Sequence, residues 1–455
     1  MTETIRQKLS DSKAARWTAL IIVSFTMMCG YFITDVMAPL EDLLMRTYSW
    51  TSTEYGFFSG AYGWFNVIFF MLILGGIILD KMGVRFTGQM ACGLMVVGAL
   101  IKAYAVSDLF PIGGDLIAGH KLQVVVAGLG FATFGMGVEI AGITVSKIIV
   151  KWFTGHELAL AMGLQVALAR IGTAFALFFS LPLANSNYFG KVSTPVWLGA
   201  LMLCIGTISF LVYRVMDKKL DASEEAASAG SEPEEGFKLN DIGIIVTNKG
   251  FWLIAILCVL FYSGVFPFLK FATKLMIYKY GVDETLAGTI PGLLPFGTIL
   301  LTPLFGSLYD RIGKGATLML IGSVMLTVVH ILFALPLLNE WWFATCVMIV
   351  LGIAFSLVPS AMWPSVAKII PQKQLGTAFS LIFYVQNWGL MGVPMLIGWV
   401  IDRYARLPGE PPAYDYTVPM LIFALFGLLA ILFSFLLKAE DRKKSYGLEQ
   451  PNIRK

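Results

Sequence analysis

The chain has 455 residues, of which 57% are hydrophobic and only 14% are charged, and its formal net charge is +4. Soluble proteins of this length are far less hydrophobic, and so small a charge argues against a nucleic-acid-binding protein. The five cysteines and three histidines are scattered through apolar stretches, which excludes a disulfide framework or a clustered metal site. Because the sequence offers no nucleophile–base pair either, we predict a membrane protein that is not an enzyme and needs no cofactor or metal.

Twelve apolar runs are long enough to cross a bilayer, which takes about 20 helical residues. They lie at residues 17–40, 53–79, 87–106, 122–149, 157–184, 193–214, 250–275, 284–308, 316–338, 341–367, 374–401 and 416–438. The leader before residue 17 is polar and the first run is full length, so we expect an uncleaved first span rather than a signal peptide.

A short cassette occurs twice, each time at the end of the second span of a six-span half. Residues 76–85 and 306–314 both place an acid beside a base between two glycines. Internal repeats of this kind are typical of secondary transporters. We therefore predict an all-α membrane protein of twelve transmembrane helices in two pseudo-symmetric six-helix bundles, residues 1–216 and 249–455. The small and acidic residues of 217–248 favour a flexible cytoplasmic linker, with a short surface helix near 237–246.

Basic residues are concentrated on one side of the predicted topology. An even number of spans places both termini, the linker and both cassettes on the same side, and most lysines and arginines fall there. The positive-inside rule assigns that side to the cytoplasm. We expect a multi-pass membrane protein with cytoplasmic termini.

The cassettes resemble the signature loop of the major facilitator superfamily, although in the second copy Lys314 stands one place early. Their glycines would allow a neighbouring helix to pack closely, and their acids could bind a facing helix end or arginine while the cytoplasmic side is closed. The alternative is that the loops only anchor helix ends. For two copies at matched positions we favour a gate formed by Asp80, Lys81, Arg85, Asp310 and Arg311.

Ionisable residues inside membrane spans are costly and usually functional. Glu139 and Arg170 lie at similar distances before and after the short loop that joins the fourth and fifth spans, so they reach a similar depth. An acid and a base at one depth fit a zwitterion, with Glu139 binding an ammonium and Arg170 a carboxylate. The alternatives are that the two residues neutralise each other, or that a ligand opens such a pair. Asp35 fits a substrate contact, a gate residue or a solvated mouth, and Lys270 fits a snorkelling lysine.

Aromatic and amide side chains complete a candidate binding region, although each of them alone also fits packing between helices. Trp363 lies between Pro359 and Pro364, so we expect its helix to be broken there and the tryptophan to line a cavity. The other candidates are Tyr62, Asn66, Tyr262, Gln386 and Asn387.

Three stretches resemble the lysosomal dipeptide uniporter family of animals and its bacterial relatives. They are Gly137–Glu139 followed by residues 152–172, Ala361–Pro364 leading into Gln386 and Asn387, and Tyr62–Asn66. The resemblance implies that Glu139 and Arg170 hold the two ends of a dipeptide and that Trp363 lines the pocket. The animal proteins use a glycosylated accessory subunit and a lysosomal sorting signal. This sequence has no Asn-x-Ser/Thr site or acidic dileucine leader, so we expect a protein of the bacterial inner membrane that works alone, as a monomer without an obligate protein partner.

We therefore predict a secondary transporter that moves dipeptides or similar small zwitterions by alternating access, as a uniporter. One alternative is a proton-coupled symporter or other carrier of small organic anions or sugar phosphates, with Arg170 and Lys270 as anion contacts and Glu139 structural. Another is a receptor or scaffold on this fold that transports nothing.

Overall fold

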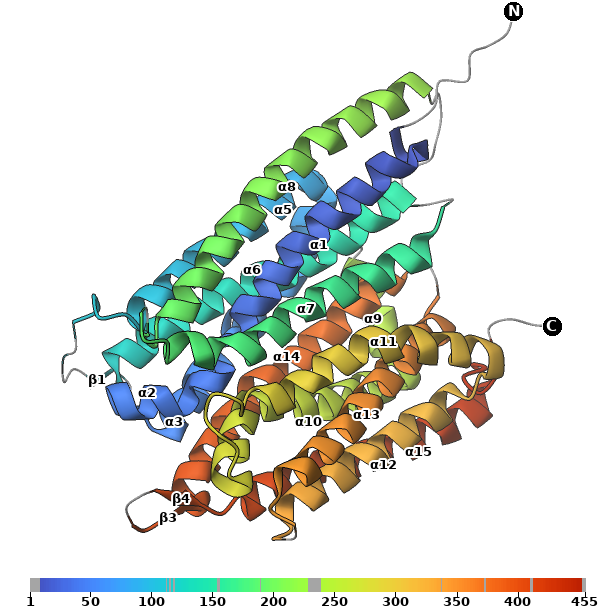
Figure 1. The fold of residues 1–455 in the computed structure, drawn as a ribbon. Helices are drawn as coiled ribbons and strands as arrows, with labels where there is room; N and C mark the ends of the chain where they lie inside the picture. The colour runs from blue at the N-terminus through green and yellow to red at the C-terminus, as the bar shows by residue number, and fades with distance from the viewer. Residues whose placement is uncertain are drawn as a thin grey trace, which may run out of the picture.

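The computed structural model describes residues 9–451 apart from 112, 114, 115, 118, 154, 155, 189, 228–238, 337, 372, 373, 410 and 411. The helices form two bundles that lie side by side, one before and one after residues 228–238 (Figure 1). We call these bundles the first and second halves. Within the described ranges the only strands are two short hairpins.

The first half begins with α1, a helix that starts at an N-cap, Ser12, whose side chain accepts a hydrogen bond from the Ala15 amide. Its elements are η1 (Leu9–Asp11), α1 (Lys13–Asp35), η2 (Ala38–Leu40), α2 (Glu41–Tyr48), α3 (Ser52–Gly60), η3 (Ala61–Gly63), α4 (Trp64–Ile68), α5 (Met71–Ala105), β1 (Leu116–Ile117), β2 (His120–Lys121), α6 (Leu122–Phe153), α7 (Leu158–Ala184) and α8 (Thr194–Ala227). The strands β1 and β2 pair antiparallel.

The second half follows the short helix α9 (Leu239–Val246), which agrees with the surface helix expected from the sequence. Its elements are α10 (Lys249–Tyr280), α11 (Thr289–Ile312), α12 (Gly315–Ala334), α13 (Trp341–Ile369), α14 (Leu375–Val400), η5 (Ile401–Ala405), β3 (Arg406–Leu407), β4 (Ala413–Tyr414) and α15 (Thr417–Lys444). The strands β3 and β4 also pair antiparallel.

Eleven helices of the described chain are long and apolar enough to span a membrane, against twelve predicted spans. The difference lies in the second and third spans. The predicted span 53–79 is divided into α3, η3, α4 and the start of α5, and α5 continues through the third predicted span. A straight helix of its 35 residues would be about 50 Å long, well beyond a hydrocarbon core of about 30 Å. The helix is interrupted at Gly83, whose φ of 75° and ψ of 172° are not helical.

The predicted linker differs from expectation at its start. Helix α8 continues to Ala227, so the stretch from 217 to 227 is helical rather than flexible. Asp217 explains part of this continuation, because its carboxylate lies 2.8 Å from the Lys151 ammonium and accepts a hydrogen bond from Tyr213. Residues 228–238 lie outside the described residues.

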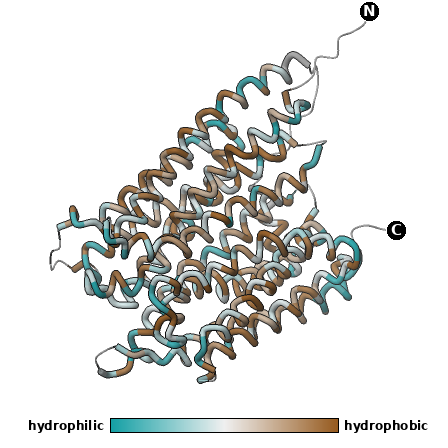
Figure 2. Tube along the Cα trace, viewed as in Figure 1, coloured by the Kyte–Doolittle hydropathy of each residue, from teal (hydrophilic) through white to brown (hydrophobic). Residues whose placement is uncertain are grey.

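The bundle surface is apolar along the helices, and hydrophilic residues gather toward the two ends (Figure 2). Large side chains such as Leu300, Leu201 and Phe435 are exposed on it, as expected where lipid replaces water. We call the end with the two chain termini and α9 the terminal end, and the end with α2 and the two hairpins the hairpin end (Figure 1). Between the halves, α3 packs against α14 and α7 against α11.

Candidate functional site

Glu139 lies on α6 with its carboxylate facing the broken second span. The Tyr62 hydroxyl, in η3, donates a hydrogen bond of 2.7 Å to its Oε1 atom. This approach depends on Gly135, one turn earlier on α6, because a Cβ there would lie only 2.2 Å from the Tyr62 carbonyl oxygen. Both Glu139 and Tyr62 are half-buried, so part of each side chain stays accessible inside the bundle.

Two amide side chains join the halves beside Glu139. Asn66, on α4, donates through Nδ2 to Oδ1 of Asn387 on α14 at 3.2 Å, and both residues are fully buried. Gln386 points elsewhere, since its Oε1 accepts from the Cys258 thiol. Of the two neighbouring amides predicted on this helix, the structure therefore brings Asn387 to the region of Glu139 and Tyr62.

Arg170, on α7, is surrounded by aromatic rings. Its guanidinium carbon lies 5.4 Å from the ring centroid of Tyr31, 5.0 Å from that of Phe266 and 5.3 Å from that of Phe355. Gly172 permits the close packing of α7 on α1, because a Cβ there would lie 2.0 Å from the Met28 carbonyl oxygen.

Glu139 and Arg170 do not neutralise each other. Among the described residues the structure contains no salt bridge between them, and no hydrogen bond from the Arg170 guanidinium to an acceptor of this chain. Tyr31 lies within electrostatic reach of both residues and of Asp35. The acid and the base therefore both lie in the surroundings of Tyr31, and neither forms an ion pair with the other.

The rings around Arg170 lead to Trp363. Phe266 and Phe355 both contact the ring of Tyr262, with centroids 5.3 and 5.7 Å away. The Trp363 indole N–H donates to the Tyr262 hydroxyl at 3.3 Å. Tyr262 and Trp363 thereby belong to the same aromatic cluster as Arg170.

The expected break beside Trp363 is wrong, because α13 runs without interruption through Pro359 and Pro364. Serine hydroxyls in this segment bond to backbone carbonyls. Ser360 donates to the Ser356 carbonyl at 2.6 Å and to the Thr302 carbonyl of α11 at 3.1 Å. The second of these bonds ties α13 to α11.

Asp35 lies at the junction of the halves and is buried, which contradicts a solvated mouth position. Its Oδ1 pairs with the Lys270 ammonium of α10 at 2.6 Å, and its Oδ2 accepts from the Thr173 hydroxyl of α7 at 2.8 Å. The expectation of a snorkelling Lys270 is wrong, because its side chain is only 12% exposed and also donates to the Thr34 carbonyl at 2.7 Å.

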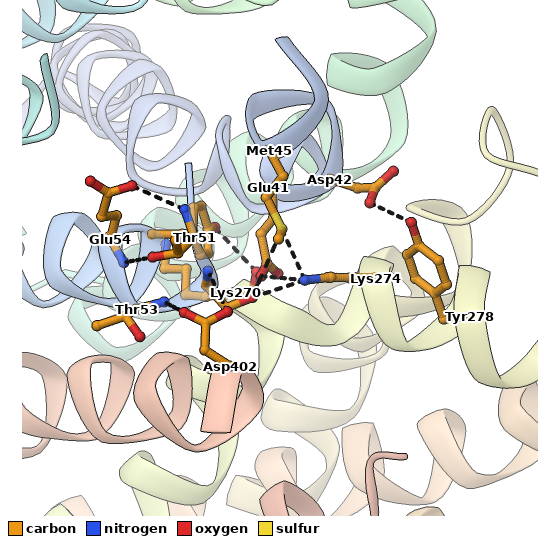
Figure 3. Close-up of polar contacts among 12 residues, drawn as sticks. Glu41, Asp42, Met45, Thr51, Thr53, Glu54, Lys270, Lys274, Tyr278 and Asp402 are labelled. Carbon is orange, nitrogen blue, oxygen red and sulfur yellow. Dashed lines mark hydrogen bonds and ion pairs between the residues drawn. The ribbon is translucent and has the colours of Figure 1, made fainter. Parts of the chain in front are cut away.

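A network of polar contacts continues from this pair to the hairpin end (Figure 3). Lys274 of α10 lies 3.2 Å from the Glu41 carboxylate and 2.9 Å from the Ser52 hydroxyl, and both charged side chains are 1% exposed. Asp402, in η5 directly after α14, accepts from the Ser52 and Thr53 amides at 3.0 and 2.6 Å. A carboxylate of the second half therefore caps the N-terminus of α3, where the helix dipole favours a negative charge.

The same network includes a second carboxylate of α2. Asp42 accepts from the Tyr278 hydroxyl at 2.7 Å, and Arg46 bridges Asp42 and Glu284 at 2.7 and 2.8 Å. We call the inter-half contacts of Glu41, Asp42, Arg46, Ser52 and Thr53 with the second half the hairpin-end lock.

The first cassette makes its ion pairs within its own half. Asp80 pairs with Lys147 at 2.7 Å, and Arg85 pairs with Asp221 at 2.7 Å. Lys81 is exposed.

The second cassette packs against the last described residues of the chain. The Lys314 and Gly315 amides donate to the carbonyls of Glu449 and Leu448. Asp310 is half-buried and Arg311 is exposed.

We expected the first glycine of each cassette to allow a neighbouring helix to pack closely. This expectation is wrong for the present conformation, since a Cβ at Gly76 or Gly306 would meet nothing within 4 Å. In this conformation both positions lie in open space.

The rings around Arg170 and the pairing of Lys270 with Asp35 were not predicted from the sequence. Tyr31 precedes Asp35 by one helical turn, and Phe266 precedes Lys270 in the same way. This spacing was the available signal, because residues four apart share a helix face. Phe355 had no such signal, since α13 carries many apolar residues and only packing selects one of them.

Comparison with known proteins agrees with this architecture. A family model described as Major Facilitator Superfamily matches residues 20–394 and 271–452. The lysosomal dipeptide transporter MFSD1 of Bos taurus is 28% identical over 408 residues, which cover 87% of this chain and 81% of that protein. The D-galactonate transporter of Escherichia coli is 22% identical over 94% of this chain and 96% of its own length. A bacterial homolog of the human lysosomal transporter Spinster, in an inward-facing and unoccupied conformation, superposes with a TM-score of 0.71 at 14% identity, covering 95% of this chain and 98% of that one.

Proposed function

Because this chain belongs to the Major Facilitator Superfamily, we propose that it carries dipeptides or similar small zwitterions across a bacterial plasma membrane by alternating access of its halves. It acts as a uniporter and a monomer, with both termini in the cytoplasm. Glu139 binds the ammonium of the solute and Arg170 binds the carboxylate, while Tyr62, Asn66, Asn387, Tyr262 and Trp363 shape the site between them.

The observation that carries this proposal is that neither Glu139 nor Arg170 forms an ion pair with a described residue of this chain. Arg170 presents five N–H donors within an aromatic enclosure and bonds none of them to a described residue. Arg170 is half-buried, so its guanidinium stays accessible, and a ligand carboxylate could bind it in a bidentate manner. Tyr62 holds one oxygen of Glu139 in place and leaves the carboxylate able to accept from an ammonium.

The two ends of the molecule supply the conformational part of the mechanism. Ion pairs between described residues cross from one half to the other only at the hairpin-end lock and at Asp35–Lys270. With the basic terminal end in the cytoplasm, this conformation is closed to the outside and faces inward. Solute binding then acts by changing which of two conformations is lower in free energy.

The relatives support the substrate class and also define the second candidate. The dipeptide transporters share their architecture over most of this chain. A D-galactonate transporter is similar at lower identity, and its named substrate is a carboxylate without an ammonium. If this chain carries organic anions instead, Arg170 is still used but Glu139 is not.

A thermal-shift panel on the detergent-purified protein separates these candidates. Dipeptides should raise the unfolding temperature more than single amino acids, sugar acids or sugar phosphates. Stabilisation by the anions and not by any dipeptide would overturn the proposal.

Two matched variants test the orientation of the solute. Glu139→Gln should weaken dipeptide binding by about 2 kcal/mol or more, because one charge of a desolvated pair is lost, and should spare an N-acetylated dipeptide. Arg170→Met should spare a dipeptide with a C-terminal amide. If each variant binds the dipeptide and its modified form equally weakly, Glu139 and Arg170 have only a structural role.

Liposome uptake decides the transport mode. A uniporter should take up dipeptide at the same initial rate whether or not a pH gradient is imposed across the liposome membrane. Acceleration by an inward proton gradient would make the protein a symporter, and absence of uptake despite binding would favour a receptor.

A further inference from the structure

Three helices around Arg170 each contribute two residues that lie one helical turn apart. The pairs are Tyr31 and Asp35 on α1, Arg170 and Thr173 on α7, and Phe266 and Lys270 on α10. Tyr31 and Phe266 enclose Arg170, whereas Thr173 and Lys270 both bond to Asp35. The side chains therefore form two layers separated by about one turn, or roughly 5 Å.

The layer that contains Asp35 has two residues from the first half, Asp35 and Thr173, and one from the second half, Lys270. Asp35 keeps two links within the first half, its own helix and the hydrogen bond from Thr173. Lys270 is the member that comes from the second half, and it reaches both the Asp35 carboxylate and the Thr34 carbonyl. If the halves separate at this level, Lys270 must leave and Asp35 remains anchored.

The last turn of α1 strengthens this attachment. Lys270 and the fully buried Lys102 donate to the adjacent carbonyls of Thr34 and Ile33, at 2.7 and 2.6 Å. Carbonyls at a helix C-terminus carry partial negative charge and favour cations. Lys102 belongs to the same half as α1, so of these two lysines it is Lys270 that couples this helix end to the other half.

We propose that Lys270 is the residue through which a solute carboxylate bound at Arg170 unlocks the hairpin end, by drawing the Lys270 ammonium away from Asp35. This inference rests on the proposed function. It gives the solute carboxylate two roles. Its contact with Arg170 provides binding affinity, and its attraction for Lys270 favours separation of the halves at the hairpin end.

The geometry makes this exchange feasible. A lysine ammonium on a flexible four-carbon stem can move through about one helical turn without a change of backbone. In the empty protein Asp35 is its anionic partner, and in the occupied protein a carboxylate one layer below competes for it. Since coupling is reciprocal, whatever weakens the pair of Asp35 and Lys270 also favours the occupied, opening state.

Lys274 offers a matched control for Lys270. It lies one turn farther along α10, also pairs across the halves, and is more deeply buried. Because it lies two turns from Phe266, a carboxylate at Arg170 should not reach it. Its loss should loosen the lock without removing the response to solute.

The test measures exposure of a cysteine at position 38. Ala38 lies in η2, which packs on α10, and is 2% exposed. The full-length protein carries A38C, with the two cysteines that are not buried, Cys204 and Cys346, replaced by alanine. The rate of labelling by a water-soluble maleimide reports opening, with the same chain lacking A38C as the blank.

Alanyl-alanine at saturation should raise the labelling rate of the A38C chain about tenfold, within the usual range of ligand coupling. K270M should label fast with or without the dipeptide, whereas K274M should label faster than the parent and still respond to it. Loss of the response in both variants, or its retention in K270M, would overturn the inference.

A second arm needs no substitution beyond those of the A38C chain. Alanyl-alanine amide, added at a concentration that saturates binding by thermal shift, should leave the labelling rate of the A38C chain within about twofold of the empty protein. An increase equal to that of the free dipeptide would overturn the role of Lys270. If neither ligand shifts the unfolding temperature, the proposed function fails instead, and the two failures are thereby distinguished.

Discussion

The two ends of this molecule use charged residues in different ways. At the terminal end, the ion pairs between described residues join helices of one half, as in Asp80–Lys147 and Lys249–Glu440. At the hairpin end, Glu41–Lys274 and Arg46–Glu284 join one half to the other. Pairs of the first kind hold each half together as a unit. Those of the second kind set how the two units lie against each other.

The pairs Glu41–Lys274 and Asp80–Lys147 also differ in burial. Glu41 and Lys274 are each 1% exposed, whereas the side chains of Lys147 and Asp80 are 37% and 25% exposed. A partner removed from a buried pair leaves an uncompensated charge, while a partner removed from an exposed pair is replaced by water. Changes at the hairpin end should therefore alter the conformation, and changes at the terminal end should not.

The largest effect is expected for Glu41→Gln. The Lys274 ammonium would stay buried without a carboxylate, which should disfavour the present conformation by about 3–5 kcal/mol. The measurement is maleimide labelling of the A38C chain, which should become fast in the absence of solute. The double variant Glu41→Gln/Lys274→Met removes both charges and should recover most of the slow labelling. Slow labelling of the single variant would contradict the division between the ends.

An intermediate effect is expected for Asp402→Asn. Asparagine can still accept a hydrogen bond from the Ser52 or Thr53 amide, but the full negative charge at the N-terminus of α3 is lost. We expect labelling of the A38C chain to rise by the equivalent of about 0.5–1 kcal/mol. A rise as large as that of Glu41→Gln would mean that Asp402 and not Lys274 dominates the lock.

The smallest effect is expected for Lys147→Met. Its pair with Asp80 is partly exposed and lies within one half, so the free energy of unfolding should change by no more than about 1 kcal/mol. Thermal unfolding at low and high salt measures this change, and screening should reduce it at high salt. Labelling of the A38C chain should stay at the parent rate, and a clear increase would show that the first cassette also controls the hairpin end.

Much of the fold follows from the sequence because the bilayer leaves few choices. A backbone in lipid must satisfy its own hydrogen bonds, so long apolar runs become helices, and the repeated cassette shows that there are two halves. Where the sequence carries glycine or proline, the local outcome is harder to predict. Gly83 interrupts α5 between the predicted second and third spans, whereas Pro359 and Pro364 do not interrupt α13.

A similar depth for Glu139 and Arg170 is predicted from the sequence, because both lie a similar number of residues from one short loop. Their partners do not. The acid meets Tyr62 because Gly135 admits the broken second span, and the base meets Phe266 and Phe355 from the other half.

The helices and the cassettes follow from the sequence alone, and a pair of charges at one depth is predicted from it, because these depend on hydropathy and on spacing along a helix. Only the tertiary structure decided that the pair is open rather than neutralised, and that Lys270 pairs with Asp35. The reason is physical. Asp35 and Lys270 belong to different halves, and which charges meet across that interface depends on how the halves pack, a property that helical periodicity does not contain.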